Sequence, residues 1–270
     1  MVHHEKIEEF LRGVANAPLS VLLLDYDGTL APLVLNRSQA TPYEGLTDIL
    51  QKITNTGRTR LLVVTGRDAR QIPPLLGLEP PPEVWGAYGL QRLRADGVYE
   101  MPEIPARVKR SLDEARRWLR YQGLQQCAEI KPGSIAVHWR GMENGAATAL
   151  RETVLLGWFE IAERASLKLL EFDGGVEMRM SGPDKGDVVR IILKEVGSGV
   201  PVAYLGDDAT DEHAFEALGQ NGLTVLVRPA PRRSAAQVWL EAPQELMEFL
   251  ARVLAAAEIS PRSGGAIHSQ

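Results

Sequence analysis

The hydrophobic residues of this chain form short unbroken runs, separated by longer stretches of helical periodicity. Short apolar runs without polar alternation are typical of strands buried on both faces of a parallel sheet. We predict such strands at residues 20–24, 60–64, 202–205 and 224–227. Helices are predicted around them, at residues 42–55, 185–195 and 211–218, after an opening helix that carries Ile7, Phe10, Leu11 and Val14. This alternation predicts an α/β fold, built on a Rossmann-like, doubly wound parallel sheet.

The pattern changes between residues 102 and 180. Helices are predicted there at residues 106–121 and 145–165, and strands at residues 127–131, 134–140, 168–172 and 176–180. Strands that follow one another without intervening helices predict an inserted α+β unit. We therefore expect a discontinuous core, residues 1–101 and 181–270, that carries residues 102–180 as a cap.

Charge and composition exclude several classes of partner. Thirty basic and 35 acidic residues give a net charge of −5, which repels nucleic acids and anionic membranes. The apolar runs are far shorter than the roughly 20 residues that a spanning helix needs. The first residues lack the apolar core of a secretory signal, so we expect a cytoplasmic protein that contacts no membrane. Cys127 is alone and forms no internal disulfide. No feature specifies an oligomer, and we expect a monomer or a weak dimer.

Two carboxylates follow the first predicted strand. Asp25 and Asp27 stand at i and i+2, and Gly28 allows the backbone to turn so that both face one pocket. Such a pair suits a reaction in which one carboxylate is the nucleophile and the other moves protons. The alternative is an Asp-Gly turn with solvated acids, which is less specific than the whole hexapeptide Asp-Tyr-Asp-Gly-Thr-Leu after a buried strand.

A second acidic group follows the strand at residues 202–205. Asp207, Asp208 and Asp211 lie within five residues and repel one another unless a cation is present. Oxygen ligands without a cluster of Cys or His favour Mg²⁺ over zinc or copper. Acids are also favourable at the start of a helix. We expect both interpretations to hold, with Asp211 more structural than Asp207.

Two further strand or helix ends carry groups that suit a phosphate. Thr65 and Gly66, followed by Arg67, offer a hydroxyl and backbone amides where the second predicted strand ends. Lys185 adds a positive charge where the chain returns from the cap to the core. Each signal is weak when it is taken alone.

The four motifs together resemble the haloacid dehalogenase (HAD) superfamily of phosphotransferases. Within it the chain is most similar to the trehalose-6-phosphate phosphatases, on Leu22 to Leu33 (LLLDYDGTLAPL), Gly206 to Phe215 (GDDATDEHAF) and the position of the cap. This resemblance implies that Asp25 attacks phosphorus to form an aspartyl phosphate and that Asp27 is the acid and base. It also implies Mg²⁺ on the Asp25 carboxylate, the Asp27 carbonyl and Asp207, with Asp208 nearby, and a phosphoryl group held by Thr65, Gly66 and Lys185.

The cap is expected to select the sugar. Glu177 and Arg179 alternate in a predicted strand and point to the same side, toward the core. The resemblance assigns Glu177 a hydrogen bond to a glucosyl hydroxyl, while a salt-bridged strand is the alternative. His138 and Arg140 share a predicted strand face and match the His-x-Arg of the family's cap. Lys131 is a further candidate for binding the sugar.

One segment departs from the family. Its usual Gly-Asn-His-Gly, followed by a small or apolar residue and Glu, is replaced here by Gly86-Ala87-Tyr88-Gly89-Leu90-Gln91. We therefore weigh three alternatives to a trehalose-6-phosphate phosphatase. They are a phosphatase of another glycosyl phosphate such as glucosylglycerol phosphate, a sugar phosphomutase, and a non-catalytic module that binds sugar phosphates.

Overall fold

The chain builds two sheets of different kinds. The computed structural model describes residues 2–34, 39–172 and 174–259. The larger sheet has eight strands in the order β12-β11-β10-β1-β2-β3-β4-β5, of which the first six run parallel. Its strands are β1 (Ser20–Leu24), β2 (Thr59–Val64), β3 (Glu83–Gly86), β4 (Gln91–Leu93), β5 (Tyr99–Glu100), β10 (Val202–Gly206), β11 (Leu223–Val227) and β12 (Val238–Leu240).

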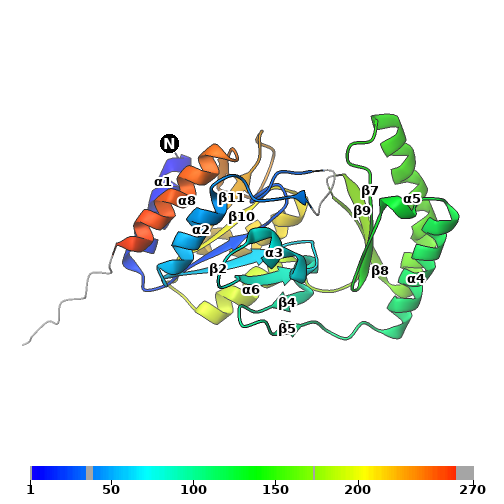
Figure 1. Cartoon of the computed structure of the whole chain (residues 1–270), viewed down its shortest axis with the longest axis horizontal. Helices are drawn as coiled ribbons and strands as arrows, with labels where there is room; N and C mark the ends of the chain where they lie inside the picture. Colours follow the sequence, from blue (N-terminus) through cyan, green and yellow to red (C-terminus); the bar gives the residue numbers. More distant parts are fainter. Residues whose placement is uncertain (1, 35–38, 173, 260–270) are drawn as a thin grey trace, which may run out of the picture.

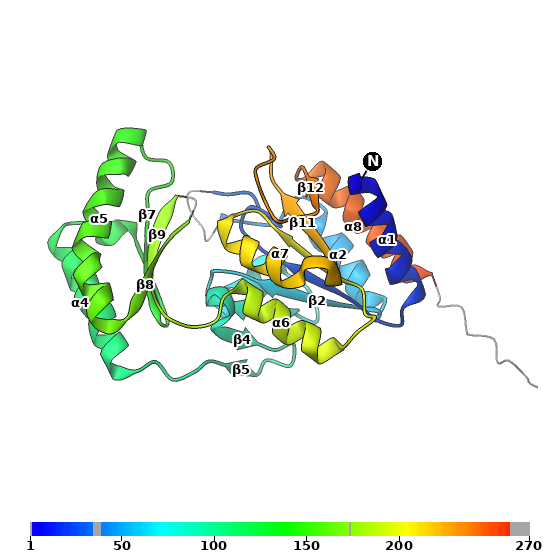
Figure 2. The same ribbon diagram turned by 180° about the vertical axis from the view of Figure 1, so that it is seen from behind.

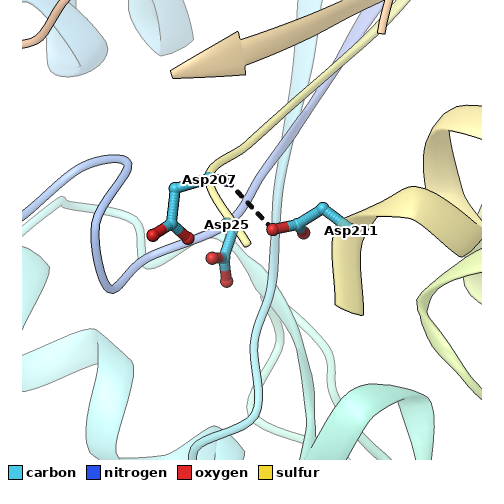
Figure 3. A group of neighbouring side chains, drawn as sticks. All are labelled: Asp25, Asp207 and Asp211. Atoms are coloured by element: carbon cyan, nitrogen blue, oxygen red, sulfur yellow. Dashed lines mark hydrogen bonds between the residues drawn. The ribbon is translucent and has the colours of Figure 1, made fainter. Parts of the chain in front are cut away.

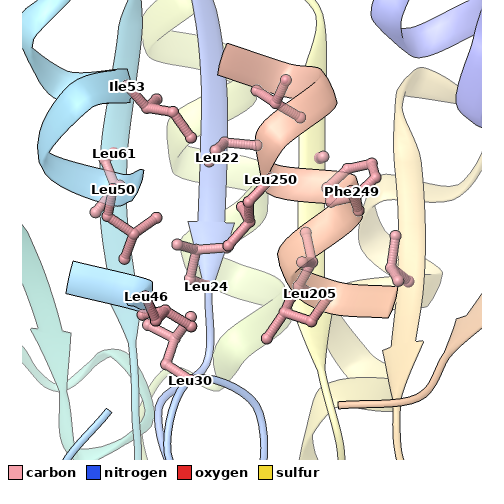
Figure 4. Packing of buried hydrophobic residues seen from close by; sticks show 14 of the residues in the cluster. Leu22, Leu24, Leu30, Leu46, Leu50, Ile53, Leu61, Leu205, Phe249 and Leu250 are labelled. Carbon is pink, nitrogen blue, oxygen red and sulfur yellow. The ribbon is translucent and has the colours of Figure 1, made fainter. Parts of the chain in front are cut away.

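Helices cover both faces of this sheet (Figures 1 and 2). Successive residues of β1 point to opposite faces of the sheet, so its apolar side chains pack alternately into two hydrophobic cores. Leu22 and Leu24 belong to the core under one group of helices, part of which Figure 4 shows. Val21 and Leu23 belong to the core under the other group. The first group is α1 (Val2–Asn16), α2 (Leu46–Asn55), α3 (Ile72–Leu76) and α8 (Gln244–Glu258), and the second is α6 (Lys185–Val196) and α7 (Glu212–Leu218).

The inserted unit has its own sheet and core. Four antiparallel strands lie in the order β6-β7-β9-β8, and two helices pack on one face of them. Figures 1 and 2 show these helices on the side of the cap sheet away from the core. The elements are α4 (Ala106–Tyr121), β6 (Ala128–Lys131), β7 (Ser134–His138), α5 (Asn144–Ala165), β8 (Leu167–Phe172) and β9 (Gly175–Met180).

The predicted α/β fold with an inserted α+β unit is confirmed, and the differences concern short or peripheral elements. The helix predicted from residue 42 begins at Leu46. The prediction omitted β3, β4, β5, β12, α3 and α8. The helix α8 has a readable signal, because Leu246, Phe249, Leu250 and Val253 recur at helical spacing and are buried.

The strand predicted at residues 134–140 is too long. It ends at His138, which pairs with Gly175, the first residue of β9. The ladder with the neighbouring strand ends at that point, and the backbone N–H of Trp139 donates to the carbonyl of Gly174 at 2.8 Å. Arg140 therefore lies in the turn after the strand, so the shared strand face expected for His138 and Arg140 is wrong.

No helix among the described residues has the length and apolar composition needed to cross a membrane.

Candidate active site

Asp25 begins the site at the carboxyl end of β1. Its backbone N–H still donates to the carbonyl of Leu205, at 2.9 Å, so the residue continues the line of the strand. Parallel neighbours end at the same edge of the sheet, which brings Asp25 beside Asp207 and the first turn after β10. One carboxylate oxygen each from Asp25, Asp207 and Asp211 lies within 4.8 Å of the others (Figure 3).

Asp211 is the structural member of this group. Its Oδ1 lies 2.7 Å from Nζ of Lys185 and accepts a 2.6 Å hydrogen bond from the hydroxyl of Tyr204. Its Oδ2 accepts from the backbone N–H groups of Asp207 and Asp208, both at 3.0 Å. These bonds occupy both oxygens and hold the backbone of the acidic loop, as expected from the more structural role given to Asp211.

Lys185 links the two acidic loops. Its Nζ lies 3.0 Å from Oδ1 of Asp25 as well as beside Asp211, and the lysine is 2% exposed. It stands first in α6, whose start is stabilised by a reciprocal capping box between Asp184 and Asp187. The capping box therefore stabilises the helix start that carries the buried ammonium group of Lys185.

Burial dominates the electrostatics of the carboxylates. It raises the pKa of Asp25 to about 8, with further contributions from Asp211 and Asp208 and against the opposing charge of Lys185. Burial and the nearby Asp25 likewise raise the pKa of Asp207 well above its usual value. Burial alone would lower the pKa of Lys185, but Asp211 and Asp25 outweigh it and raise that pKa.

The donor set suits a hard divalent cation. Asp25 and Asp207 are 4% exposed and present carboxylate oxygens, the ligands that Mg²⁺ prefers. A second positive charge beside them would offset their mutual repulsion, which adds to the effect of burial on both pKa values. Gly28 makes the approach possible: a methyl group on it would lie 2.0 Å from Oδ2 of Asp207, and its φ is +85°. The residues present therefore fit a metal ion.

Asp27 pairs with an arginine that the sequence had left without a role. Nε of Arg67 donates to Oδ2 of Asp27 at 2.7 Å, and Nη2 donates to Oδ1 at 2.5 Å. Arg67 is 2% exposed and lies over the ring of Tyr26, 5.3 Å from its centroid. The readable signal was its position, directly after Thr65-Gly66 at the strand end next to β1.

Two arginines near the acidic loop were also not predicted from the sequence. Arg228 donates to the carbonyl of Asp207 at 2.9 Å, and Arg232 donates to that of Asp208 at 2.7 Å. The Asp208 carboxylate accepts from the backbone and the hydroxyl of Thr210, at 2.7 and 2.6 Å. Asp208 therefore caps the following turn, which fits a place near the cation rather than within its first ligand shell.

A pocket at this edge contains most of the predicted residues of the core and three of those of the cap. Core and cap both contribute to it, because Thr65, Gly66 and Lys185 of the core and Lys131 of the cap line the same pocket. Residues that were not predicted also line it, namely Leu33, Tyr88, Phe172 and Thr210. The full lining is Asp25, Asp27, Leu33, Thr65, Gly66, Tyr88, Lys131, His138, Arg140, Phe172, Lys185, Asp207, Asp208 and Thr210.

Glu177 and Arg179 point to the same side of β9, as predicted. Oε1 of Glu177 lies 2.8 Å from Nζ of Lys131, while Oε2 is buried and has no hydrogen-bond partner among the described residues. The guanidinium of Arg179 lies over the ring of Tyr88 and donates to the carbonyl of Pro183 at 2.5 Å. Neither residue is among those lining the pocket. Glu177 is thus both salt-bridged and provided with an unused acceptor.

His138 lies in the pocket within a polar pair. Its Nε2 is 2.9 Å from Oε2 of Glu129, and its ring meets that of Phe172 edge-on at 5.3 Å. This partner arrangement orients the imidazole toward a neighbouring carboxylate rather than toward the acidic cluster.

Comparisons with known proteins show what this chain resembles. The trehalose-phosphate phosphatase of Mycobacterium tuberculosis is 30% identical over 256 residues, which cover 89% of this chain and 62% of that protein. The chain is therefore similar in sequence to proteins named trehalose-phosphate phosphatases. It spans about 62% of the length of the curated relatives it matches. No protein-family model matches the chain.

Solved structures show the same fold. The C-terminal domain of the trehalose-6-phosphate phosphatase of Candida albicans superimposes with a TM-score of 0.79 at 18% identity, over 92% of this chain and 96% of that domain. A phosphatase of the HAD superfamily from Bacteroides thetaiotaomicron gives 0.58 at 16% identity, over 87% and 95%. The fold is therefore that of the HAD superfamily, with a cap domain.

Proposed function

We propose that the chain is a Mg²⁺-dependent phosphatase that releases trehalose and phosphate from trehalose 6-phosphate. The observation that carries the proposal is that Asp25, Asp27 and Lys185 converge on one pocket with the phosphate-binding loop at residues 65–66 and the polar cap residues. Relatives named as trehalose-phosphate phosphatases support the substrate. The proposed division assigns residues 1–101 and 181–270 to the core and residues 102–180 to the cap.

The chain's own residues supply the nucleophile and the proton donor and acceptor for both chemical steps. A carboxylate oxygen of Asp25 attacks phosphorus, and the bond from phosphorus to the sugar oxygen breaks while Asp27 gives that oxygen a proton. Asp27 then takes a proton from water, whose oxygen attacks phosphorus and releases phosphate and the Asp25 carboxylate. Arg67 fixes the position of the Asp27 carboxylate through two hydrogen bonds.

The phosphoryl group needs a positive environment. Lys185, with the hydroxyl of Thr65 and the backbone of Gly66, would hold its oxygens. The carboxylates of Asp25 and Asp207 and the backbone carbonyl of Asp27 would hold Mg²⁺. When bound, the ion supplies charge that offsets the phosphoryl oxygens and the carboxylates.

The cap would recognise the leaving sugar. Glu177 offers an unpaired oxygen, Oε2, for a sugar hydroxyl, next to the ammonium group of Lys131. His138 and Arg140 line the pocket from the end of β7 and the turn after it. Arg179 contacts the core instead, so its part in sugar binding would be indirect. The cytoplasmic location and the monomeric or weakly dimeric state stay predictions from the sequence.

A phosphatase of another glycosyl phosphate is the second candidate, and the segment at residues 86–91 favours it. Tyr88 stands where the family has His, and it lines the pocket. Gln91 stands where the family has Glu; it is fully buried and accepts from the backbone N–H of Ala69 at 2.7 Å. Gln91 therefore supports the loop, while Tyr88 changes the wall of the pocket.

The test is phosphate release from trehalose 6-phosphate, glucose 6-phosphate and glucosylglycerol phosphate, with and without Mg²⁺. We expect selective, Mg²⁺-dependent release from trehalose 6-phosphate that is lost in Asp25→Asn. Faster release from another glycosyl phosphate would replace the substrate and keep the mechanism. An isomerised sugar phosphate in place of free phosphate would indicate a mutase. Binding of sugar phosphate without turnover would indicate a binding module.

A further inference from the structure

Tyr88 is a core residue held in an unusual backbone conformation beside the phosphate-binding loop. It lies in the turn after β3 with φ +59°, and its backbone N–H donates to the carbonyl of Thr65 at 2.9 Å. Non-glycine residues seldom adopt such a φ, and those that do often lie at functional sites. The ring lies against Gly66, where an added methyl group would be 2.6 Å from Cζ of Tyr88. The loop and the ring therefore form one surface.

Two cations of the cap lie over this ring. Cζ of Arg179, on β9, is 4.9 Å from the ring centroid, and Nζ of Lys131, on β6, is 5.6 Å from it. Both distances are within the range of a cation–π contact. Lys131 also donates to the carbonyl of Gly66 at 3.0 Å. Two strands of the cap sheet thus meet the core at one aromatic side chain.

We propose that Tyr88 is a positioning residue whose ring docks the cap on the core and thereby places Lys131 and Glu177 for sugar recognition. The part concerning the sugar rests on the proposed phosphatase function. Lys131 is 2.8 Å from Oε1 of Glu177, so fixing the lysine also fixes the carboxylate. Contact with Tyr88 would in this way fix the distance between the loop at residues 65–66 and the side chains of Lys131 and Glu177.

The buried setting makes these contacts effective. Lys131 is 5% and Arg179 is 7% exposed, so water screens neither cation from the ring. The ammonium group of Lys131 has three directions of contact, toward Glu177, the Gly66 carbonyl and Tyr88. A side chain without a π face at residue 88 would remove the third contact of Lys131 and would leave Arg179 with only its hydrogen bond to the carbonyl of Pro183.

The activity test compares Tyr88→Leu with Tyr88→Phe, which keeps the ring and removes only the hydroxyl. The readout is kcat/KM for trehalose 6-phosphate divided by kcat/KM for p-nitrophenyl phosphate, a substrate without a sugar. Two desolvated cation–π contacts predict that this ratio falls by roughly 5- to 30-fold in Tyr88→Leu, and far less in Tyr88→Phe. An unchanged ratio in Tyr88→Leu, or an equal fall in both variants, would overturn the proposal.

Small-angle scattering without substrate tests docking independently of activity. We expect a larger radius of gyration for Tyr88→Leu than for the wild type, and a value like the wild type for Tyr88→Phe. Matching profiles of all three proteins would refute docking by the ring. If the wild type hydrolyses no sugar phosphate, the proposed function fails and the scattering comparison still decides docking. If Tyr88→Leu does not fold, Arg179→Met removes one of the two contacts from the cap side instead. We then expect Arg179→Met to have a larger radius of gyration than the wild type. An unchanged radius of gyration would refute docking by the ring.

Discussion

Nζ of Lys185 lies 2.7 Å from Oδ1 of Asp211, and both side chains are buried. The same ammonium group lies 3.0 Å from Asp25, so one lysine joins the ends of two neighbouring strands. A buried ion pair loses far more when one partner is removed than it contributes as a pair, because the remaining charge is left uncompensated. Lys185 and Asp211 are therefore expected to be sensitive to single substitutions.

Replacing Asp211 with Asn is expected to destabilise the protein. The change removes the negative charge nearest to Lys185 and replaces one of the two accepting carboxylate oxygens with an NH2 group, so buried donors on one side of residue 211 lose their acceptor. We expect a loss of about 3–5 kcal/mol in the free energy of unfolding. Urea unfolding followed by circular dichroism measures it. Asp113→Asn, on the exposed surface of α4, is the matched control and should cost less than about 0.5 kcal/mol. Equal costs in the two variants would show that the buried network contributes nothing specific.

Gly28→Ala is expected to damage the site beyond its backbone strain. Gly28 and Gly97 have nearly the same φ, +85° and +87°, but only at Gly28 would the new methyl group meet an atom, Oδ2 of Asp207 at 2.0 Å. Gly97→Ala should cost only the strain of the left-handed backbone, about 1–2 kcal/mol. Gly28→Ala should in addition displace Asp207 and abolish Mg²⁺-dependent phosphate release. Retained metal dependence in Gly28→Ala would contradict the close approach.

Adding Mg²⁺ should raise the melting temperature, and the effect should depend on Asp207. An ion bound only by the folded state stabilises it by about 2.7 kcal/mol at a concentration of 100 Kd. In Asp207→Asn the shift in Tm should disappear, because one of two buried carboxylate ligands is lost. Asp113→Asn should keep the full shift. A Tm insensitive to Mg²⁺ in the wild type would argue against a metal site, as would an undiminished shift in Asp207→Asn.

Glu195 should contribute to acid unfolding. Burial raises its pKa, but hydrogen bonds from Arg60 and Arg92 outweigh this and hold the pKa below its usual value of 4.5. The stabilisation is therefore present above about pH 4.5 and is lost as the pH falls through the lower pKa of the folded state. Between about pH 6 and pH 3 the wild type should lose more unfolding free energy than Glu195→Gln. Glu103→Gln, an exposed control, should show the same pH dependence as the wild type. Parallel curves of unfolding free energy against pH for all three proteins would refute the role of Glu195.

Local patterns determined the parts of the site that lie at strand ends. The apolar run before Asp25 is long enough to be a buried strand, and the chain turns at Gly28, so the place of Asp25 could be predicted without knowledge of its neighbours. The same reasoning placed Asp207, whereas Lys185 was placed by its position at a predicted helix start, where the chain returns from the cap to the core. Strand ends in a parallel sheet share one edge, which made their convergence predictable as well.

Only the tertiary structure decided which side chains meet. The pairs Asp27 with Arg67 and Lys185 with Asp211 join residues 40 and 26 positions apart. Their geometry depends on strand order and on how the crossover helices pack, and no local periodicity encodes either. Arg140 left its predicted strand because β9 provides no partner beyond Gly175. The sequence by itself determined the acidic groups and the fold class, whereas the contact of Tyr88 with the cap required two units of the fold to be placed against each other.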